Sequence, residues 1–68
     1  MKPIQIDNIN QIKERDLVIL NDHTLEKLEM TIEEYAISLE ASKIYYMEEN
    51  FRDGRRTGQF RRYWIARK

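Results

Sequence analysis

The chain has 68 residues, of which 41% are hydrophobic and 35% are charged, and it contains no cysteine. This length allows one domain with a thin core, and the missing cysteine excludes disulfides, thiolate metal sites and a cysteine nucleophile. The formal net charge of +0 hides a division, because residues 1–50 carry five Lys/Arg and eleven Asp/Glu (net −6) and residues 51–68 carry seven and one (net +6).

Residues 1–15 are rich in Asn, Gln and Ile, and their structure is left open, except that the alternation of Ile4 and Ile6 suits a short edge strand. The segment lacks the apolar stretch of a signal peptide, and no run in the chain approaches the roughly 20 apolar residues of a membrane span. We therefore expect a cytoplasmic protein without a membrane partner.

Residues 16–20 form a short apolar run with two β-branched members, closed by Asn21 and Asp22. This pattern predicts a buried strand that leads into a turn or a helix cap.

From Thr24 the apolar residues recur at steps of three and four, which predicts one central amphipathic helix. Its apolar face comprises Leu25, Leu28, Ile32, Tyr35, Ala36 and Leu39. Of these, Leu28, Ile32 and Leu39 are expected to be stability positions in the core. Thr31 and Glu34 also match a capping box, so two helices broken at residues 30–31 remain an alternative.

Two strand-like segments follow, at residues 43–47 and 59–67, and the second is dense in aromatic and β-branched residues. Tyr46 and Met47 could also continue the helix, and a helix over residues 59–67 stays open because Phe60, Tyr63, Trp64 and Arg67 also stand at helical spacing. Between the two segments, Asp53-Gly54 is the strongest short turn signal of the chain, so residues 52–58 are predicted to be the loop of a hairpin. The fold class is therefore α+β, a single small domain over residues 1–68. The alternative is a mostly α protein with a long helix over residues 24–50.

The chain offers little for catalysis. His23 is the only histidine and suits a helix N-terminus, and Ser38 and Ser42 have no base nearby in the pattern. A lone histidine also lacks the further ligands that a metal needs. We therefore expect no enzyme activity, no cofactor, no metal and no small-molecule substrate.

Basic side chains concentrate on the predicted hairpin. They are Arg52, Arg55, Arg56, Arg61, Arg62, Arg67 and Lys68. Guanidinium groups bind phosphate oxygens and stack on bases, and the interleaved Phe60, Tyr63 and Trp64 can act as stacking platforms. These residues are thus candidates for binding nucleic acid or an acidic partner. Alternatively, the aromatic residues form the core, which is the favoured interpretation for them, and the arginines neutralise the acidic helix.

A continuous helix would present a second candidate surface. An acidic stripe that includes Glu26 and Glu33 would lie beside the core face, and beyond it an apolar strip of Met30, Ile37 and Ala41. A small domain gains by covering such a strip, so these five residues are a candidate protein interface, either to a larger partner or in a homo-oligomer.

Two functions follow. The preferred one is a small protein-binding regulator or inhibitor that acts through the acidic helix, the arginine-rich hairpin, or both. The alternative is a nucleic-acid-binding accessory protein that contacts the phosphate backbone through the hairpin. The neutral overall charge disfavours non-specific DNA binding, and the only good helix is acidic, which does not suit a groove of DNA.

Overall fold

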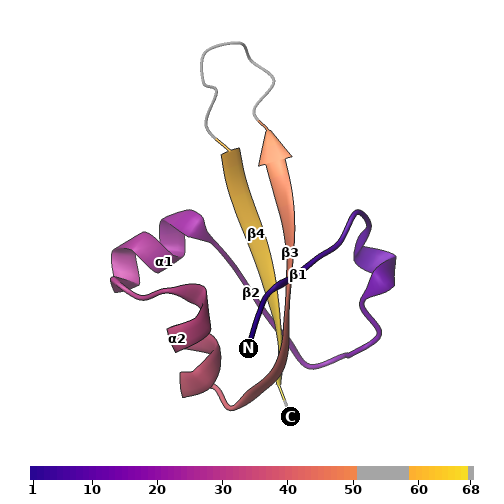
Figure 1. Ribbon diagram of the computed structural model, residues 1–68, viewed down its shortest axis with the longest axis horizontal. Coiled ribbons are helices and arrows are strands. Elements are labelled where there is room, and N and C mark those ends of the chain that lie inside the picture. Colours follow the sequence, from indigo (N-terminus) through magenta and orange to yellow (C-terminus); the bar gives the residue numbers. More distant parts are fainter. Residues whose placement is uncertain (51–58, 68) are drawn as a thin grey trace.

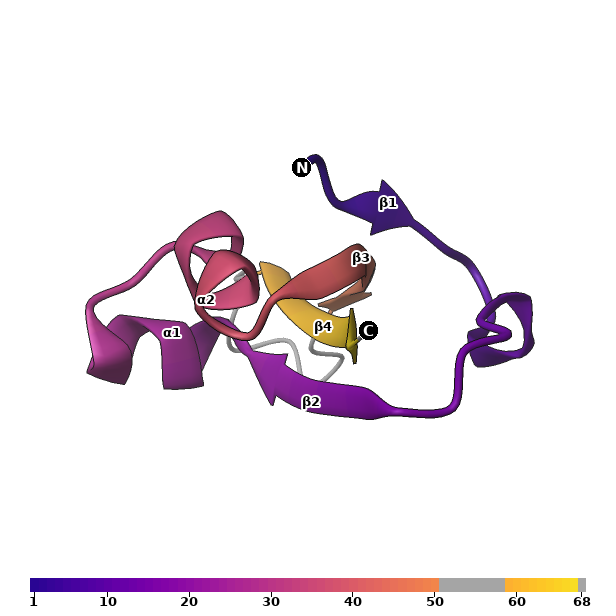
Figure 2. The same cartoon turned by 90° about the horizontal axis from the view of Figure 1, so that it is seen from below.

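A computed structural model describes residues 1–50 and 59–67 of the chain. A four-stranded sheet carries two short helices on one side and the N-terminal segment on the other (Figures 1 and 2). The predicted α+β class is confirmed. In chain order the elements are β1 (Ile4–Gln5), the 3-10 helix η1 (Ile9–Gln11), β2 (Leu17–Asn21), α1 (Asp22–Leu28), α2 (Ile32–Ser38), β3 (Ala41–Asn50) and β4 (Gln59–Arg67).

The strands lie in the order β1-β3-β4-β2, so the hairpin strands β3 and β4 occupy the centre. They pair antiparallel, with one irregularity between Ala41 and Lys43. β2 runs antiparallel to β4 at one edge, and β1 runs parallel to β3 at the other. The two strands of the predicted hairpin are therefore present, whereas its loop at residues 52–58 lies outside the described residues.

β2 confirms the strand predicted at residues 16–20, but its burial differs. Leu20 is buried against the helices, whereas Ile19 is 61% exposed. The strand lies at an edge and not in the interior of the sheet: Leu17 is only partly buried against the smaller core, and Ile19 on the same face is left uncovered. The interpretation of this run as a buried strand was wrong for that reason.

The central helix is interrupted, and the single continuous helix is a wrong prediction. α1 ends at Leu28, and its C-cap residue, Glu29, has left-handed backbone dihedrals (φ 55, ψ 39). Thr31 then caps α2: its hydroxyl accepts a hydrogen bond from the Glu34 N–H, and the Glu34 side chain accepts one from the Thr31 N–H. This is the predicted capping box. The long helix over residues 24–50 is also wrong, because residues 41–50 form β3.

Two hydrophobic cores lie on opposite faces of the sheet. The larger one, under the helices, contains Leu20, Leu25, Ile32, Ala36, Ala41, Ile44, Tyr63 and Ile65. The smaller one, under the N-terminal segment, contains Ile6, Tyr45, Trp64 and Ala66. Successive side chains of a strand point to opposite faces, so β3 and β4 each serve both cores. The favoured packing interpretation therefore holds for Tyr63 and Trp64.

Some expected core positions differ. Ile32 is buried as predicted and Leu39 is half-buried, but Leu28 is 45% exposed because α1 ends there. Ala41 belongs to β3 and is 7% exposed, so it does not lie on an exposed helical strip with Ile37.

Within the described part of the chain, no helix is long and apolar enough to cross a membrane.

Candidate protein-binding groove

A hollow of about 610 Å³ lies where the junction of α1 and α2 meets the central strands. We call it the α1–β4 groove. It is lined by Lys2, Pro3, Asp22, Leu25, Glu26, Met30, Thr31, Ile32, Glu33, Tyr46, Arg61 and Tyr63. It therefore combines residues from both surfaces that the sequence suggested, the acidic helix and the basic hairpin.

Two tyrosines of the central strands are cross-strand partners in this lining. Tyr46 of β3 faces Tyr63 of β4 in the register, and their ring centroids are 6.3 Å apart at an interplanar angle of 42°. The guanidinium carbon of Arg61 lies 5.0 Å from the centroid of the Tyr46 ring. Nη2 of Arg61 lies 3.4 Å from Oε1 of Glu48. An arginine placed over a ring and beside a carboxylate is held in one place by both.

Asp22 joins the helix to the hairpin at the end of the groove. Its Oδ1 accepts a hydrogen bond of 2.9 Å from the Tyr63 hydroxyl, and its Oδ2 accepts one of 3.0 Å from the Arg61 backbone N–H. Burial raises the pKa of the Tyr63 hydroxyl, and the hydrogen bond to Asp22 raises it further. The hydroxyl therefore stays protonated as a donor, and each oxygen of the Asp22 carboxylate accepts one hydrogen bond from β4.

The rim of the groove is accessible and carries charges of both signs, because the exposed residues Lys2 and Arg61 also line it. Glu26 on α1 and Glu33 on α2 are exposed, and among the described residues neither side chain makes a hydrogen bond or an ion pair. Met30 lies between them in the chain and is half-buried. The rim thus places two carboxylates, without partners in the described part of the chain, beside a lining of mixed apolar and polar side chains.

The basic residues of the hairpin are not brought together. Arg61 lines the α1–β4 groove, whereas Arg62, the next residue of the strand, lines a hollow of about 400 Å³ with Trp64 and Met47. Arg67 is near the opposite end of β4, where its Nε lies 4.0 Å from Oδ2 of Asp16. The predicted residues Arg52, Arg55, Arg56 and Lys68 lie outside the described residues.

The predicted apolar strip is also divided. Met30 lines the groove, Ile37 is 68% exposed on α2, and Ala41 is buried in β3. Only Met30, Glu26 and Glu33 of the predicted protein interface line one hollow. The strip required a continuous helix, and the break at residues 29–31 removes that geometry.

Sequence reasoning named Tyr63 as a possible stacking platform, but it did not place Tyr46, Tyr63 or Asp22 in a groove. Period-two alternation offers a signal for the tyrosines, because it assigns Tyr46 and Tyr63 each to one face of its strand. The hairpin register that pairs them was not derivable without the loop geometry. Asp22 offered no signal, because its partners are 39 and 41 residues away.

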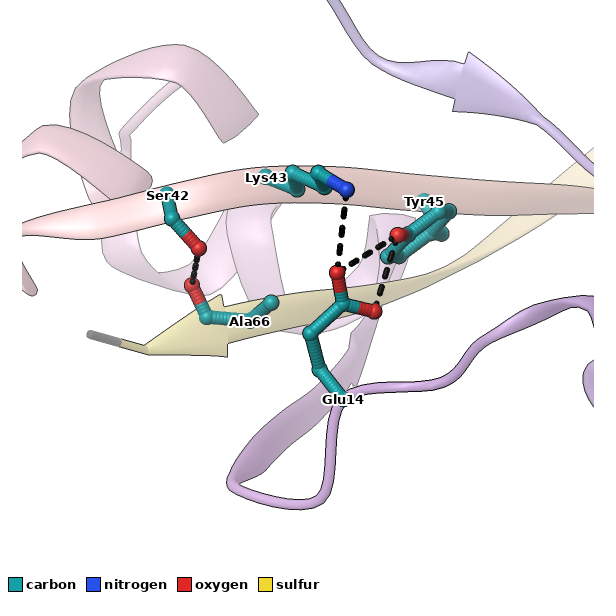
Figure 3. A network of polar contacts seen from close by, with 5 residues as sticks. All are labelled: Glu14, Ser42, Lys43, Tyr45 and Ala66. Atoms are coloured by element: carbon teal, nitrogen blue, oxygen red, sulfur yellow. Dashed lines mark hydrogen bonds and ion pairs between the residues drawn. The ribbon is translucent and has the colours of Figure 1, made fainter.

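A polar cluster on the other side of the sheet holds the N-terminal segment (Figure 3). Both carboxylate oxygens of Glu14 accept from the Tyr45 hydroxyl, at 3.0 and 2.9 Å, and Oε1 lies 3.2 Å from Nζ of Lys43. The hydrogen bond from Tyr45 is the main cause that lowers the pKa of Glu14, and Lys43 lowers it further. This cluster is structural and lies apart from the α1–β4 groove.

The lowered pKa of Glu14 predicts a pH dependence of stability. The contribution of Glu14 is present above its unfolded pKa, near 4.5, and is lost as the pH falls through its lower folded pKa. We expect the urea midpoint of Glu14→Gln to lie below that of the parent chain at about pH 6. The difference between the two midpoints should be smaller at about pH 3. Equal differences at both pH values would contradict this role.

Comparison with protein families, with curated proteins and with solved structures found no match to this chain.

His23 lies in the first turn of α1, as predicted. Among the described residues, no group of three His, Cys, Asp or Glu side chains is placed to hold a metal ion.

Proposed function

We propose that the protein is a small, non-enzymatic protein-binding regulator whose α1–β4 groove holds an exposed segment of a larger partner. The observation that carries this proposal is a lining in which apolar side chains and two tyrosine rings lie beside two carboxylates, Glu26 and Glu33, that have no partner among the described residues. The partner segment that fits this arrangement carries both apolar and basic side chains.

The lining offers contact area at low cost in entropy. Tyrosine has few rotatable bonds and a large apolar ring, and both tyrosines are already held by the fold through Arg61 and Asp22. Met30 adds a side chain that adapts its shape to a partner. An apolar residue of a partner loses water against this lining without the groove having to reorder.

The rim selects the charge of the partner. A lysine or arginine lays its aliphatic stem along apolar surface and keeps its charged end outside, within reach of Glu26 or Glu33. Such pairs steer association and reject acidic segments more than they add affinity. The groove is lined by three acidic and two basic residues, so its charge favours a basic segment over a phosphate backbone.

The nucleic-acid alternative gains less support from the described residues. Arg61 and Arg67 have carboxylate neighbours in Glu48 and Asp16, and Arg61 and Arg62 line different hollows. A backbone binder needs several basic side chains on one surface. Nucleic-acid binding is kept as an outcome of the test below.

The test is affinity capture from host lysate with and without nuclease, at low and high salt, using three tagged forms of the protein. The groove variant combines Glu26→Lys with Glu33→Lys. The matched control combines Glu29→Lys with Glu40→Lys, which makes the same charge change at exposed residues outside the lining. Both variants are first checked for an unchanged urea midpoint.

We expect one protein to be captured in stoichiometric amount by the parent and the control, to survive nuclease, and to be lost by at least tenfold with the groove variant. Equal capture by all three forms would reject the groove as the binding site. Capture of nucleic acid that is removed by salt would instead support the accessory-protein alternative.

A further inference from the structure

The outer edge of β2 presents backbone groups that are not used by the sheet. The carbonyl of Asp16 accepts a 3.0 Å hydrogen bond from the Arg67 N–H. Together with the register of β2 and β4, this bond determines which residues of β2 form hydrogen bonds to β4. Residues of an antiparallel strand alternate between inward and outward backbone groups. Val18 and Leu20 therefore bond to β4, whereas Leu17 and Ile19 direct their N–H and C=O groups away from the sheet. The N–H of Asn21 also points outward, but its carbonyl accepts the first hydrogen bond of α1, which Asn21 caps.

This edge lacks the usual protections against pairing. Natural edge strands are kept short, or carry proline, charged residues or bulges. The opposite edge strand, β1, has only two residues, but β2 has five, with the sequence Leu-Val-Ile-Leu-Asn and no bulge in its pairing with β4. Its central residue, Ile19, is 61% exposed. In Figure 2, β2 borders the described sheet with no other element outside it.

We propose that β2 pairs antiparallel with β2 of a second copy of this chain, about a two-fold axis at Ile19. Leu17 of each copy then faces Asn21 of the other, and Ile19 faces its own equivalent. All three outward residues stand at hydrogen-bonding positions in this register, and the two sheets become one continuous sheet.

A second copy is the occupant that this edge fits. The outward groups are self-complementary about Ile19, so an identical strand meets both groups of Ile19, the Leu17 carbonyl and the Asn21 N–H without a change of register. The net charge of +0 leaves no long-range repulsion between two copies. A 68-residue domain with two thin cores also gains from covering an exposed isoleucine.

The size of the contact sets its strength. One pair of five-residue strands buries less than the roughly 1,200 Å² of a standard stable interface. The dimer is therefore weak and depends on concentration. It also leaves the α1–β4 groove free, because neither Leu17, Ile19 nor Asn21 lines that groove. The pairing is thus independent of the proposed partner binding.

The test is analytical ultracentrifugation of the full chain from about 10 µM to about 1 mM, a range chosen for a small interface. In Ile19→Pro the lost N–H is an outward one, and proline is tolerated on an edge strand whose N–H faces solvent. In Ile19→Lys the N–H is kept and a charge is added. Ile37→Lys is the matched control, because Ile37 is exposed on α2 and remote from the edge.

We expect the parent and Ile37→Lys to dimerise with the same dissociation constant, and both Ile19 variants to weaken it at least tenfold while keeping the far-UV circular dichroism of the parent. If proline disturbs the fold, Ile19→Lys still decides. A parent that stays monomeric at the highest concentration would overturn the proposal, as would a dimer that survives Ile19→Lys.

Amide hydrogen exchange adds a residue-level readout. The amides of Ile19 and Asn21 should become protected only at high concentration, whereas those of Val18 and Leu20 should be protected at every concentration. Protection of these two outward amides that does not change with concentration would also overturn the pairing.

Discussion

Replacement of Ile65 by alanine is expected to lower the free energy of unfolding by roughly 2–5 kcal/mol, enough to unfold much of the protein at room temperature. Ile65 is fully buried in β4, the strand that pairs with both β2 and β3. It faces Ile44 across the hairpin and Val18 across the other ladder. A domain of this size has a total stability of only about 3–10 kcal/mol.

Urea denaturation followed by the fluorescence of Trp64, the only tryptophan, measures this loss. Ile37→Ala is the matched control, since the same atoms are removed from a side chain that is 68% exposed. Its cost is expected to stay within about 0.5 kcal/mol. Similar costs for the two variants would show that Ile65 is not the core residue that the structure makes it.

Replacement of Asp22 by alanine is the second large effect expected. It removes the acceptor of the Tyr63 hydroxyl and of the Arg61 N–H. A buried donor left without a partner costs about 1–3 kcal/mol. The Tyr63 hydroxyl bears most of this cost, because Tyr63 is buried and Arg61 is exposed.

A double-mutant cycle with Tyr63→Phe isolates that contact. We expect a coupling free energy of about 0.5–3 kcal/mol between Asp22→Ala and Tyr63→Phe, since the second change removes the donor that the first leaves without a partner. Asp16→Ala is the control, because Asp16 is exposed and its Arg67 contact is 4.0 Å long. Additive effects of Asp22→Ala and Tyr63→Phe would mean that the hydrogen bond adds nothing to stability.

These two results bear on the groove as well. Tyr63 belongs both to the larger core and to the lining, so replacing it changes stability and binding together. Glu26 and Glu33 belong only to the rim and are exposed. A binding defect from the rim variant can therefore be separated from a folding defect, which is why the proposed test uses the rim.

Local signals determined most of the secondary structure. The aromatic and β-branched run at residues 59–67 predicted a strand with the same limits as β4. The capping box of Thr31 and Glu34 forms as its spacing requires. Both signals depend on contacts within a few residues, so the sequence carries them without knowledge of the fold.

The same signals did not decide between one helix and two. The apolar spacing from Leu25 to Leu39 runs through the break, although Glu29 adopts a left-handed conformation that the pattern does not reveal. The prediction of an acidic stripe and an apolar strip failed with the continuous helix. The pattern does correctly predict which side of each short helix is buried, namely the side with Leu25, Ile32 and Ala36.

The sequence by itself determined the α+β class, the hairpin strands, the capping box and the division of charge between the two parts of the chain. Only the tertiary structure decided which strand is an edge, which arginine meets the acidic helices, and that Asp22 closes the groove. Those properties depend on strand order and on the faces of the sheet. They arise from contacts such as Asp22 with Tyr63, 41 residues apart, which no local pattern specifies.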